Sequence, residues 1–215
     1  MGVSPSLSVG GRAIRHSLHS AIATFRSNNT SYPSRRRRTI TVFVKQAKRL
    51  KMQQSGWFDS PIGLLKITGS VSEGVTEIKI FSEFPPHAVR ANVPACLDEC
   101  FAQLEEYFAK KRTFFTVKTT FHGTDFQREV WKQLLEIPYG QTVSYLKIAI
   151  KIGDRKAVRA IGGACNQNPI PIIAPCHRVI GINGSLVGYN GGIHIKQDLL
   201  MLENPMAFGK QASLF

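Results

Sequence analysis

The sequence predicts an α+β fold, with a small antiparallel-sheet-plus-helix domain followed by a mostly helical domain. Two short runs of β-forming residues flank a turn within residues 63–81, as in a hairpin. Apolar residues then recur with helical spacing over 94–112. Further along, two short helices around a glycine turn, at 142–152 and 154–167, form a helix-turn-helix pattern. A chain of 215 residues is long enough for two such domains.

The head of the chain, residues 1–52, is a basic, Ser- and Arg-rich extension that we expect to be disordered. Residues 1–58 hold eleven lysines and arginines and no acidic residue. They lack sustained apolar periodicity and therefore cannot bury enough surface to fold. Several interpretations stay open: an organelle transit peptide, a basic arm that contacts phosphates, an extension upstream of a start near Met52, or a nuclear import signal at Arg35–Arg38.

The composition of the remaining chain excludes several classes of protein. Residues 59–215 hold seventeen basic and fourteen acidic residues, so a nucleic-acid contact there needs a local basic patch. No run of 18 apolar residues exists, so no membrane span is expected. Four cysteines are too few for a disulfide scaffold and are read as free thiols in a reducing compartment. Cys96 and Cys100 lack further ligands at a suitable spacing, so no metal site is expected.

The first domain is expected over residues 53–120. Residues 63–68 and 75–81 are predicted strands, and Ile78 and Ile80 alternate with charged residues in the second. The helix over 94–112 carries one apolar stripe, made of Leu97, Phe101, Leu104 and Phe108. The β-rich composition of residues 113–119 favours a further strand.

The second domain is expected over residues 121–205, with a short tail over 206–215. Thr124 and Gln127 match a capping box at the start of a helix. Gly153 is expected to end the helix over 142–152, and Asp154 to cap the helix that runs to about Gln167.

The helix that follows Asp154 has two different faces. Val158, Ile161 and Cys165 recur at core spacing, whereas Arg155, Arg159, Gly162 and Asn166 line the opposite stripe. Gly162 and Gly163 each cost about 1 kcal/mol of helix stability relative to alanine, but they permit close approach of another surface. That surface is either a neighbouring helix or a nucleic-acid backbone, with Arg159 projecting past it.

The dipeptide Cys176–His177 is the strongest candidate for chemistry. A cysteine is a good nucleophile only as the thiolate, and an adjacent histidine offers a base. Pro169, Pro171 and Pro175 stiffen the approach to the thiol. A Cys–His pair alone is weak evidence, and a buried cysteine beside a solvent-facing histidine is the default interpretation, so only the neighbouring motifs can favour the catalytic one.

Those motifs closely resemble the 6-O-alkylguanine-DNA alkyltransferases, also called methylated-DNA–protein-cysteine methyltransferases. The order and spacing hold over roughly residues 124–203, and LEEYFAKKR at 104–112 is more loosely similar to the family's variable first domain. The segments that carry the resemblance are IPYGQTVSY (137–145), KAVRAIGGA (156–164), NPIPIIAPCHRVI (168–180), GYNGG (188–192) and KQDLLMLE (196–203).

The resemblance implies a role for each matching residue of the reaction centre. Cys176 would be the acceptor thiolate, His177 its base through a water, and Glu203 the residue that orients the histidine. Asn168 would brace the active-site turn, and Arg178 would hold local structure. Tyr145 would help to rotate the nucleotide and donate a hydrogen bond toward the guanine ring.

The resemblance also implies a winged helix-turn-helix-like DNA-binding motif. Its DNA-binding residues would be Arg159, which enters the base stack, with Arg155, Tyr145, Gly162, Gly163 and Asn166. The base pocket would be formed by Val179, Tyr189, Asn190 and Lys196. Asn190 stands where the family often has a small residue, which leaves the tolerance of bulky adducts open.

The expected activity is DNA repair by transfer of an alkyl group to the protein itself. The partner is double-stranded DNA that contains alkylated guanine, with 4-O-methylthymine a poorer substrate. No cofactor and no metal are expected, the protein is expected to be a monomer, and each molecule acts once. The location would be cytoplasmic in a bacterium and nuclear in a eukaryote, unless residues 1–50 target an organelle. The rival hypotheses are a non-catalytic lesion-binding module, a cysteine hydrolase or acyltransferase, and a helix-turn-helix regulator.

Overall fold

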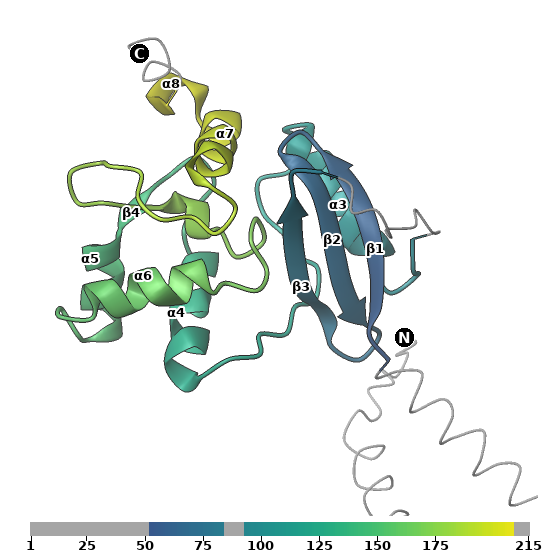
Figure 1. Ribbon diagram of the computed structural model, residues 1–215, viewed down its shortest axis with the longest axis horizontal. Coiled ribbons are helices and arrows are strands. Elements are labelled where there is room, and N and C mark those ends of the chain that lie inside the picture. The colour runs from purple at the N-terminus through teal and green to yellow at the C-terminus, as the bar shows by residue number, and fades with distance from the viewer. Residues whose placement is uncertain (1–51, 84–92, 209–215) are drawn as a thin grey trace, which may run out of the picture. The chain divides into compact units, whose positions relative to one another are not determined.

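The computed structural model describes residues 52–83 and 93–208 (Figure 1). The predicted disorder of residues 1–52 therefore lies almost wholly outside the described residues, as does most of the tail. The first half contains an antiparallel sheet in the order β1–β2–β3, made of β1 (Gln54–Ser60), β2 (Gly63–Ser70) and β3 (Gly74–Phe81). The second and third strands confirm the predicted hairpin.

The first strand was missed by the sequence analysis because its inward positions give little apolar signal. Phe58 is buried, but the residue two positions before it on the same face is Gly56. A Cβ atom at Gly56 would lie 2.9 Å from Cζ of Phe101, so the glycine lets that ring lie directly on the strand. A glycine at an inward position permits this close packing, but it interrupts the apolar alternation by which a strand is recognised in a sequence.

Helix α3 (Asp98–Phe108) is shorter than the predicted helix over 94–112. Its expected apolar stripe packs on one face of the sheet, with Leu97 and Leu104 fully buried. The helix ends early because the backbone leaves the helical region, and Lys110 has a φ of 59°.

The predicted strand over 113–119 is wrong, since the only strand-like feature there is an isolated bridge between Thr119 and Val75. The buried side chain of Gln103 in α3 takes the place of a sheet partner. Its Oε1 accepts hydrogen bonds from the backbone N–H groups of Thr116, at 2.9 Å, and Val117, at 3.3 Å. A side-chain amide thus satisfies the backbone groups that a neighbouring strand would otherwise bind.

The second half begins with α4 (Asp125–Leu135), and its capping box is confirmed. The N–H of Gln127 donates to Oγ1 of Thr124 at 3.2 Å, and the N–H of Thr124 donates to Oε1 of Gln127 at 2.8 Å. Trp131 of this helix is buried and donates from Nε1 to the carbonyl of Ala164 at 2.8 Å. This bond fixes α4 against the helix that carries the small residues.

Helix α5 (Tyr145–Ile152) begins three residues later than predicted. Ser144 is its N-cap, because its Oγ accepts the N–H of Lys147 at 3.1 Å. Val143 and Ser144 form the short strand β4, which pairs in parallel with β5 (Val179–Ile180) directly after the Cys–His pair. Gly153 ends the helix as predicted, with a φ of 91°.

Asp154 does not cap the following helix, which corrects the prediction. Helix α6 (Val158–Asn166) begins four residues later, and its N-cap, Ala157, makes no side-chain cap bond. Asp154 instead accepts the N–H of Lys156 at 2.9 Å within an intervening turn, closed by the N–H of Ala157 and the carbonyl of Asp154. The Asx-type bond competes with helix initiation at this residue.

The last elements of the described residues are α7 (Ile193–Glu203) and the single turn α8 (Pro205–Phe208). The sheet and α3 share their apolar core with α7 and with the proline-rich segment before Cys176, through Ile170, Ile172, Ile173, Ile195 and Leu199. A second core is formed by α4, α5, α6 and the Cys176 turn. The segment that carries the thiol therefore lies between two packed layers.

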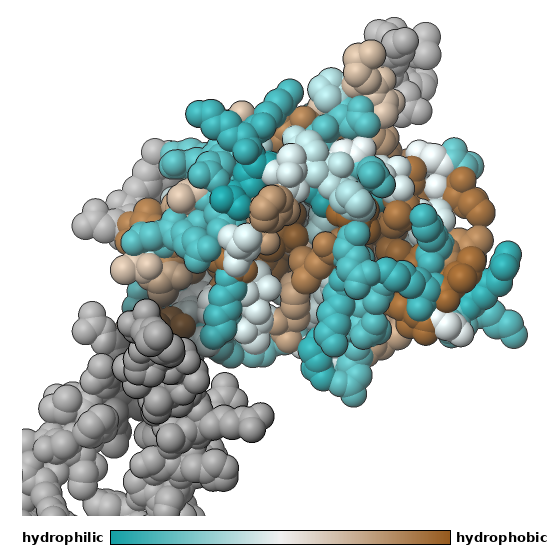
Figure 2. Space-filling model, turned by 180° about the vertical axis from the view of Figure 1, so that it is seen from behind, coloured by the Kyte–Doolittle hydropathy of each residue, from teal (hydrophilic) through white to brown (hydrophobic). Residues whose placement is uncertain are grey.

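The surface of the described residues mixes side chains of both kinds, and hydrophilic and hydrophobic residues are interspersed on the face seen in Figure 2. No helix within residues 52–83 and 93–208 has the length and apolar character needed to cross a membrane. All four cysteines are free thiols, as expected.

Replacement of Thr124 by alanine should lower the free energy of unfolding by about 1 kcal/mol, because it removes the capping oxygen of α4. Urea denaturation measures the difference. The matched control is Thr113→Ala, at an exposed threonine outside any helix, which should change stability by less than about 0.5 kcal/mol. Equal losses in the two variants would contradict the role assigned to the cap.

Candidate active site

Cys176 lies at the start of a single 3-10 turn, Cys176–Arg178, and only 5% of its surface is exposed. The side chain of Asn168 bridges the loop before it. Its Nδ2 donates to the carbonyl of Ala174 at 2.6 Å, and its Oδ1 accepts the N–H of Ile170 at 3.1 Å. Asn168 therefore braces the turn, in the place where the sequence analysis put it.

The backbone of the same loop holds a strained residue. Ile172 has a φ of 73°, a conformation that β-branched residues rarely adopt. Its side chain is fully buried in the first apolar core. Packing thus holds the loop in one conformation against the strain, and the thiol is presented from a rigid segment.

His177 is fully buried, so the interpretation of a solvent-facing histidine is wrong. Its Nε2 lies 2.8 Å from Oε1 of Glu203. Burial lowers the pKa of His177, and the adjacent Arg178 and Lys196 lower it further, against the opposing effect of Glu203. The ring is therefore neutral at pH 7. Because Glu203 is ionised, Nε2 carries the proton and Nδ1 keeps a free lone pair.

Nδ1 of His177 is buried and accepts no hydrogen bond from any described residue. A histidine that serves as a general base has this arrangement: a carboxylate binds one ring nitrogen and fixes the orientation of the ring, and the other nitrogen is free to accept a proton. The histidine is therefore oriented and has an unused acceptor beside Cys176.

Glu203, at the end of α7, is a buried carboxylate and not a surface acid. Arg178 binds it through two bonds, from Nε to Oε2 at 2.9 Å and from Nη2 to Oε1 at 2.8 Å. Two further donors were missed by the sequence analysis: Tyr107 Oη, 2.7 Å from Oε1, and the N–H of Gly140, 3.1 Å from Oε2. The hydrogen bonds from His177 and Arg178 and the charge of Arg178 outweigh burial and hold the pKa of Glu203 well below its usual range.

The thiol of Cys176 is protonated at rest, because burial raises its pKa. Several groups oppose this effect and favour the anion: the side chain of Asn168, the charge of Lys196, and the backbone N–H groups of Cys176 and His177. Burial thus disfavours ionisation of the Cys176 thiol, yet the site already contains the groups that stabilise a thiolate.

Two of the predicted pocket residues, Lys196 and Tyr189, interact electrostatically with Cys176. Lys196 is fully buried, and its Nζ donates to the carbonyls of Val179 at 2.6 Å and Val187 at 3.2 Å. The Val187 carbonyl also accepts the hydroxyl of Tyr145 at 3.1 Å, and Nζ of Lys196 lies 5.7 Å from the ring centroid of Tyr145. Lys196 and Tyr145 therefore both hold the loop over residues 181–192.

The pocket residues Tyr189 and Asn190 differ in burial. The hydroxyl of Tyr189 is buried and has no hydrogen-bond partner among the described residues. Burial and the neighbouring Cys176 raise the pKa of Tyr189 well above 10, so its hydroxyl is a protonated, unused donor. Asn190, by contrast, is exposed in the glycine-rich loop.

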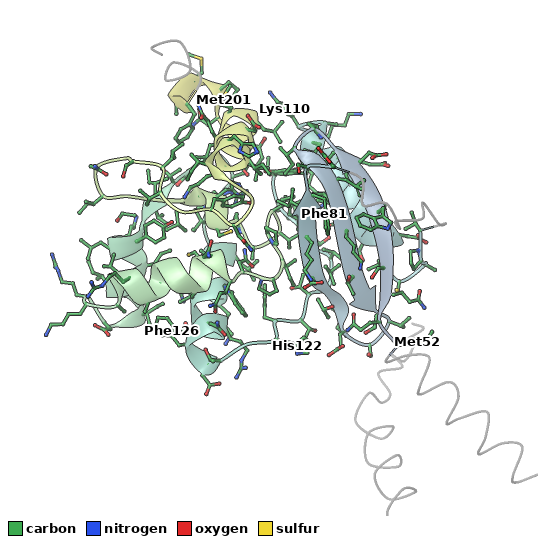
Figure 3. All side chains as sticks on the ribbon, viewed as in Figure 1. Met52, Phe81, Lys110, His122, Phe126 and Met201 are labelled. Atoms are coloured by element: carbon green, nitrogen blue, oxygen red, sulfur yellow. The ribbon has the colours of Figure 1, made fainter. Side chains whose placement is uncertain are left out.

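The small-residue face of α6 is open. A Cβ atom added at Gly162 or Gly163 would meet nothing within 4 Å, so tight packing on a neighbouring helix does not explain these glycines within the described residues. Arg159 and Asn166 are exposed, as predicted for the outer face of this helix. Arg155 is also exposed, but it lies in the turn before α6 and not on the helix as predicted. The inner face of α6 contributes Ile161 and Cys165 to the second core. Figure 3 shows long side chains that project outward at the end of this helix pair, away from the sheet.

The fold and site define a helix-turn-helix protein with a buried, histidine-paired thiol beside an open helix face. Residues 125–205 match the DNA binding domain of 6-O-methylguanine DNA methyltransferase, and residues 55–121 match the ribonuclease-like domain of the same family. The chain is 45% identical to the methylated-DNA–protein-cysteine methyltransferase of Methanosarcina barkeri over 152 residues, which cover 67% of this chain and 93% of that protein. It is 46% identical to that of Mycobacterium tuberculosis over 151 residues, which cover 69% and 91%.

Solved structures give the same result. The crystal structure of M. tuberculosis O6-methylguanine methyltransferase matches with a TM-score of 0.64 at 44% identity, over 72% of this chain and 94% of that chain. M. tuberculosis OGT in complex with DNA matches with a TM-score of 0.62 at 44% identity, over 70% and 92%. The chain belongs to the 6-O-methylguanine DNA methyltransferase family.

Replacement of Glu203 by glutamine should destabilise the protein by about 3 kcal/mol at pH 7, because it leaves the charge of Arg178 buried and unpaired. Because the folded pKa of Glu203 is lowered, its stabilising effect is complete above the unfolded pKa of about 4.3. It is lost as the pH falls toward the lower folded pKa. The difference between wild type and variant should therefore be constant from pH 6 to 8 and shrink below about pH 4.

Urea denaturation across this pH range measures the effect. The control is Glu106→Gln, which removes an exposed ion pair with Arg112 and should cost at most about 1 kcal/mol. A loss at Glu203 no larger than the loss at Glu106 would contradict the role of the buried carboxylate.

Proposed function

We propose that this protein repairs DNA by transferring a methyl or other small alkyl group from the 6-oxygen of guanine to Sγ of its own Cys176. The observations that carry the proposal are the buried Cys176 thiol, the adjacent His177 with its bond to Glu203, and the open face of α6. Membership of the family and the similarity to a relative solved with DNA support the same reading.

The reaction is a single displacement at carbon. The thiol proton passes through a water to Nδ1 of His177, whose Nε2–H is fixed by Glu203. The thiolate forms the S–C bond while the bond from carbon to the guanine oxygen breaks. The electron pair goes to the guanine ring, which takes up a proton from water while the His177 imidazolium returns the thiol proton to water. The Tyr145 hydroxyl would donate a hydrogen bond to the ring and keep its own proton. Burial raises the pKa of Tyr145, so this hydroxyl is protonated at working pH.

The base must leave the duplex to reach the thiol, since Cys176 is buried. Extrusion costs a few kcal/mol. The open face at Gly162 and Gly163 allows α6 to approach the DNA backbone closely, with Arg159 filling the space left in the base stack and Arg155 and Asn166 contacting the backbone.

The extruded base would then enter the pocket of Val179, Tyr189, Asn190 and Lys196. The unused hydroxyl of Tyr189 is available to this base. Asn190 is exposed, and at the rim of the proposed pocket it would affect the size of the adducts accepted. 4-O-Methylthymine is the poorer substrate expected from the family.

The product is a thioether, and the relay contains no group that could remove the alkyl substituent. Each molecule would therefore act once, and we expect it to act as a monomer and without a cofactor.

Replacement of Cys176 by alanine should abolish transfer and leave DNA binding in place. The assay is intact-mass measurement after incubation with a duplex that contains 6-O-methylguanine. Wild type should gain the mass of one methylene group, and the control Cys96→Ala, at a half-buried thiol in the first half, should gain the same mass. Methyl transfer to the Cys176→Ala protein would refute the assignment of the acceptor.

Replacement of Arg159 by alanine should slow transfer from duplex DNA by roughly 10- to 100-fold, because nothing then stabilises the vacated position in the base stack. Reaction with free 6-O-methylguanine base should stay at the wild-type rate. The matched control is Arg155→Ala, at an exposed arginine in the turn before α6, which should weaken DNA affinity and its salt dependence but change the rate at saturation little. Equal slowing with duplex and with free base would contradict the role given to Arg159.

A further inference from the structure

We propose that Tyr107, in α3 of the first half, is a positioning residue of the transfer reaction: its hydroxyl fixes the Glu203 carboxylate so that His177 presents Nδ1 as the base. The inference rests on the proposed function and assigns part of the relay to the sheet-containing half of the protein. Tyr107 would act through Glu203 and would not touch the DNA.

The direction of the hydrogen bond from Tyr107 is unambiguous. The Tyr107 hydroxyl lies 2.7 Å from Oε1 of Glu203, and its side chain is fully buried. Burial and the neighbouring carboxylate raise the pKa of Tyr107 well above 10, so the phenol keeps its proton. The pKa of Glu203 is lowered, so the carboxylate is ionised and can only accept. Tyr107 is therefore a permanent donor to this anion.

Packing alone does not require the hydroxyl. The ring of Tyr107 contacts three aromatic neighbours, with centroid distances of 5.2 Å to Phe108, 5.4 Å to Phe115 and 6.0 Å to Tyr139. A phenylalanine would make the same ring contacts. What the tyrosine adds is one buried polar atom, and that atom is bonded to the carboxylate that orients His177.

Oε1 of Glu203 is shared by three donors: Tyr107, His177 and Arg178. When the phenol is removed, less of the negative charge is compensated, and more of it acts on the histidine. The imidazolium form then becomes more favourable, which raises the pKa of His177. The carboxylate also loses one of the contacts that fix its plane, so the orientation of the imidazole becomes less defined.

The other groups that face this pair do not replace the lost donor. Glu203 also faces Arg178 and the N–H of Gly140, which are already bonded, and the hydroxyl of Tyr139, which lies 3.4 Å from the Leu202 carbonyl. His177 faces Glu203, Arg178 and Lys196, and Lys196 is held by two backbone carbonyls. The hydroxyl of Tyr107 therefore has a distinct effect on the base.

The test is the single-turnover rate constant of the full chain with a 6-O-methylguanine duplex, measured from pH 5 to 9. In Tyr107→Phe the rate at pH 8 should fall roughly tenfold, as for other groups that orient a reactive residue. The acidic limb of the profile should move to higher pH, because a histidine with a raised pKa becomes protonated at a higher pH. DNA affinity, measured for Tyr107→Phe in a Cys176→Ala background, should stay unchanged.

A double-mutant cycle separates positioning from packing. If Tyr107 acts through Glu203, Tyr107→Phe should have no further effect on the rate in a Glu203→Gln background. Additive losses would overturn the inference. The substitution of 3-fluorotyrosine at position 107 keeps the ring and the hydroxyl and makes the phenol a stronger donor, so the acidic limb should move to lower pH. This second variant decides the question even if Tyr107→Phe folds poorly.

The two proposals fail in different ways. A wild-type rate and pH profile in Tyr107→Phe would overturn the role of Tyr107, while transfer by the wild-type protein would still support the proposed function. A wild-type protein that gains no mass from the methylated duplex would overturn both.

Discussion

The buried carboxylate of Glu203 is the interaction on which the arrangement of the site depends. It accepts hydrogen bonds from Tyr107, from His177, from Nε and Nη2 of Arg178, and from the N–H of Gly140. These donors come from α3, from the turn that holds the thiol, and from the loop before α5. An uncompensated anion at this depth would cost several kcal/mol, so the folded state is stable only when these elements meet. The hydrogen bonds that compensate the charge of Glu203 also fix the orientation of the His177 ring.

Close to this anion lies the proposed nucleophile, which is held in its neutral form. Burial favours the neutral thiol of Cys176 and the neutral imidazole of His177. The strained backbone at Ile172 and the bridge made by Asn168 fix where the sulfur lies. In the proposed reaction this site would support one proton transfer and one displacement, on a substrate that reaches into the interior.

Local sequence signals predicted most of the helices and strands, and they singled out Cys176 and His177 as the central pair of the site. The capping box at Thr124 and the stop at Gly153 depend on residues within one turn, so the sequence reveals them directly. The strand β1 and the two-residue ladder β4–β5 were missed, because they are too short or too polar at the key positions to show a period. Tyr107 and Glu203 are 96 residues apart, and each looks like an ordinary member of its own helix. Such pairings depend on tertiary packing and not on local patterns.

The short ladder between Val143–Ser144 and Val179–Ile180 has a mechanical consequence. One of its strands leads directly into the first helix of the helix-turn-helix, and the other follows directly after the turn that carries the sulfur. A load applied to the helix pair by a bent or unwound duplex would therefore be transmitted to the nucleophile through two rungs of backbone hydrogen bonds. Docking of the helix pair on the duplex and alignment of the sulfur would then be one coupled movement and not two independent movements.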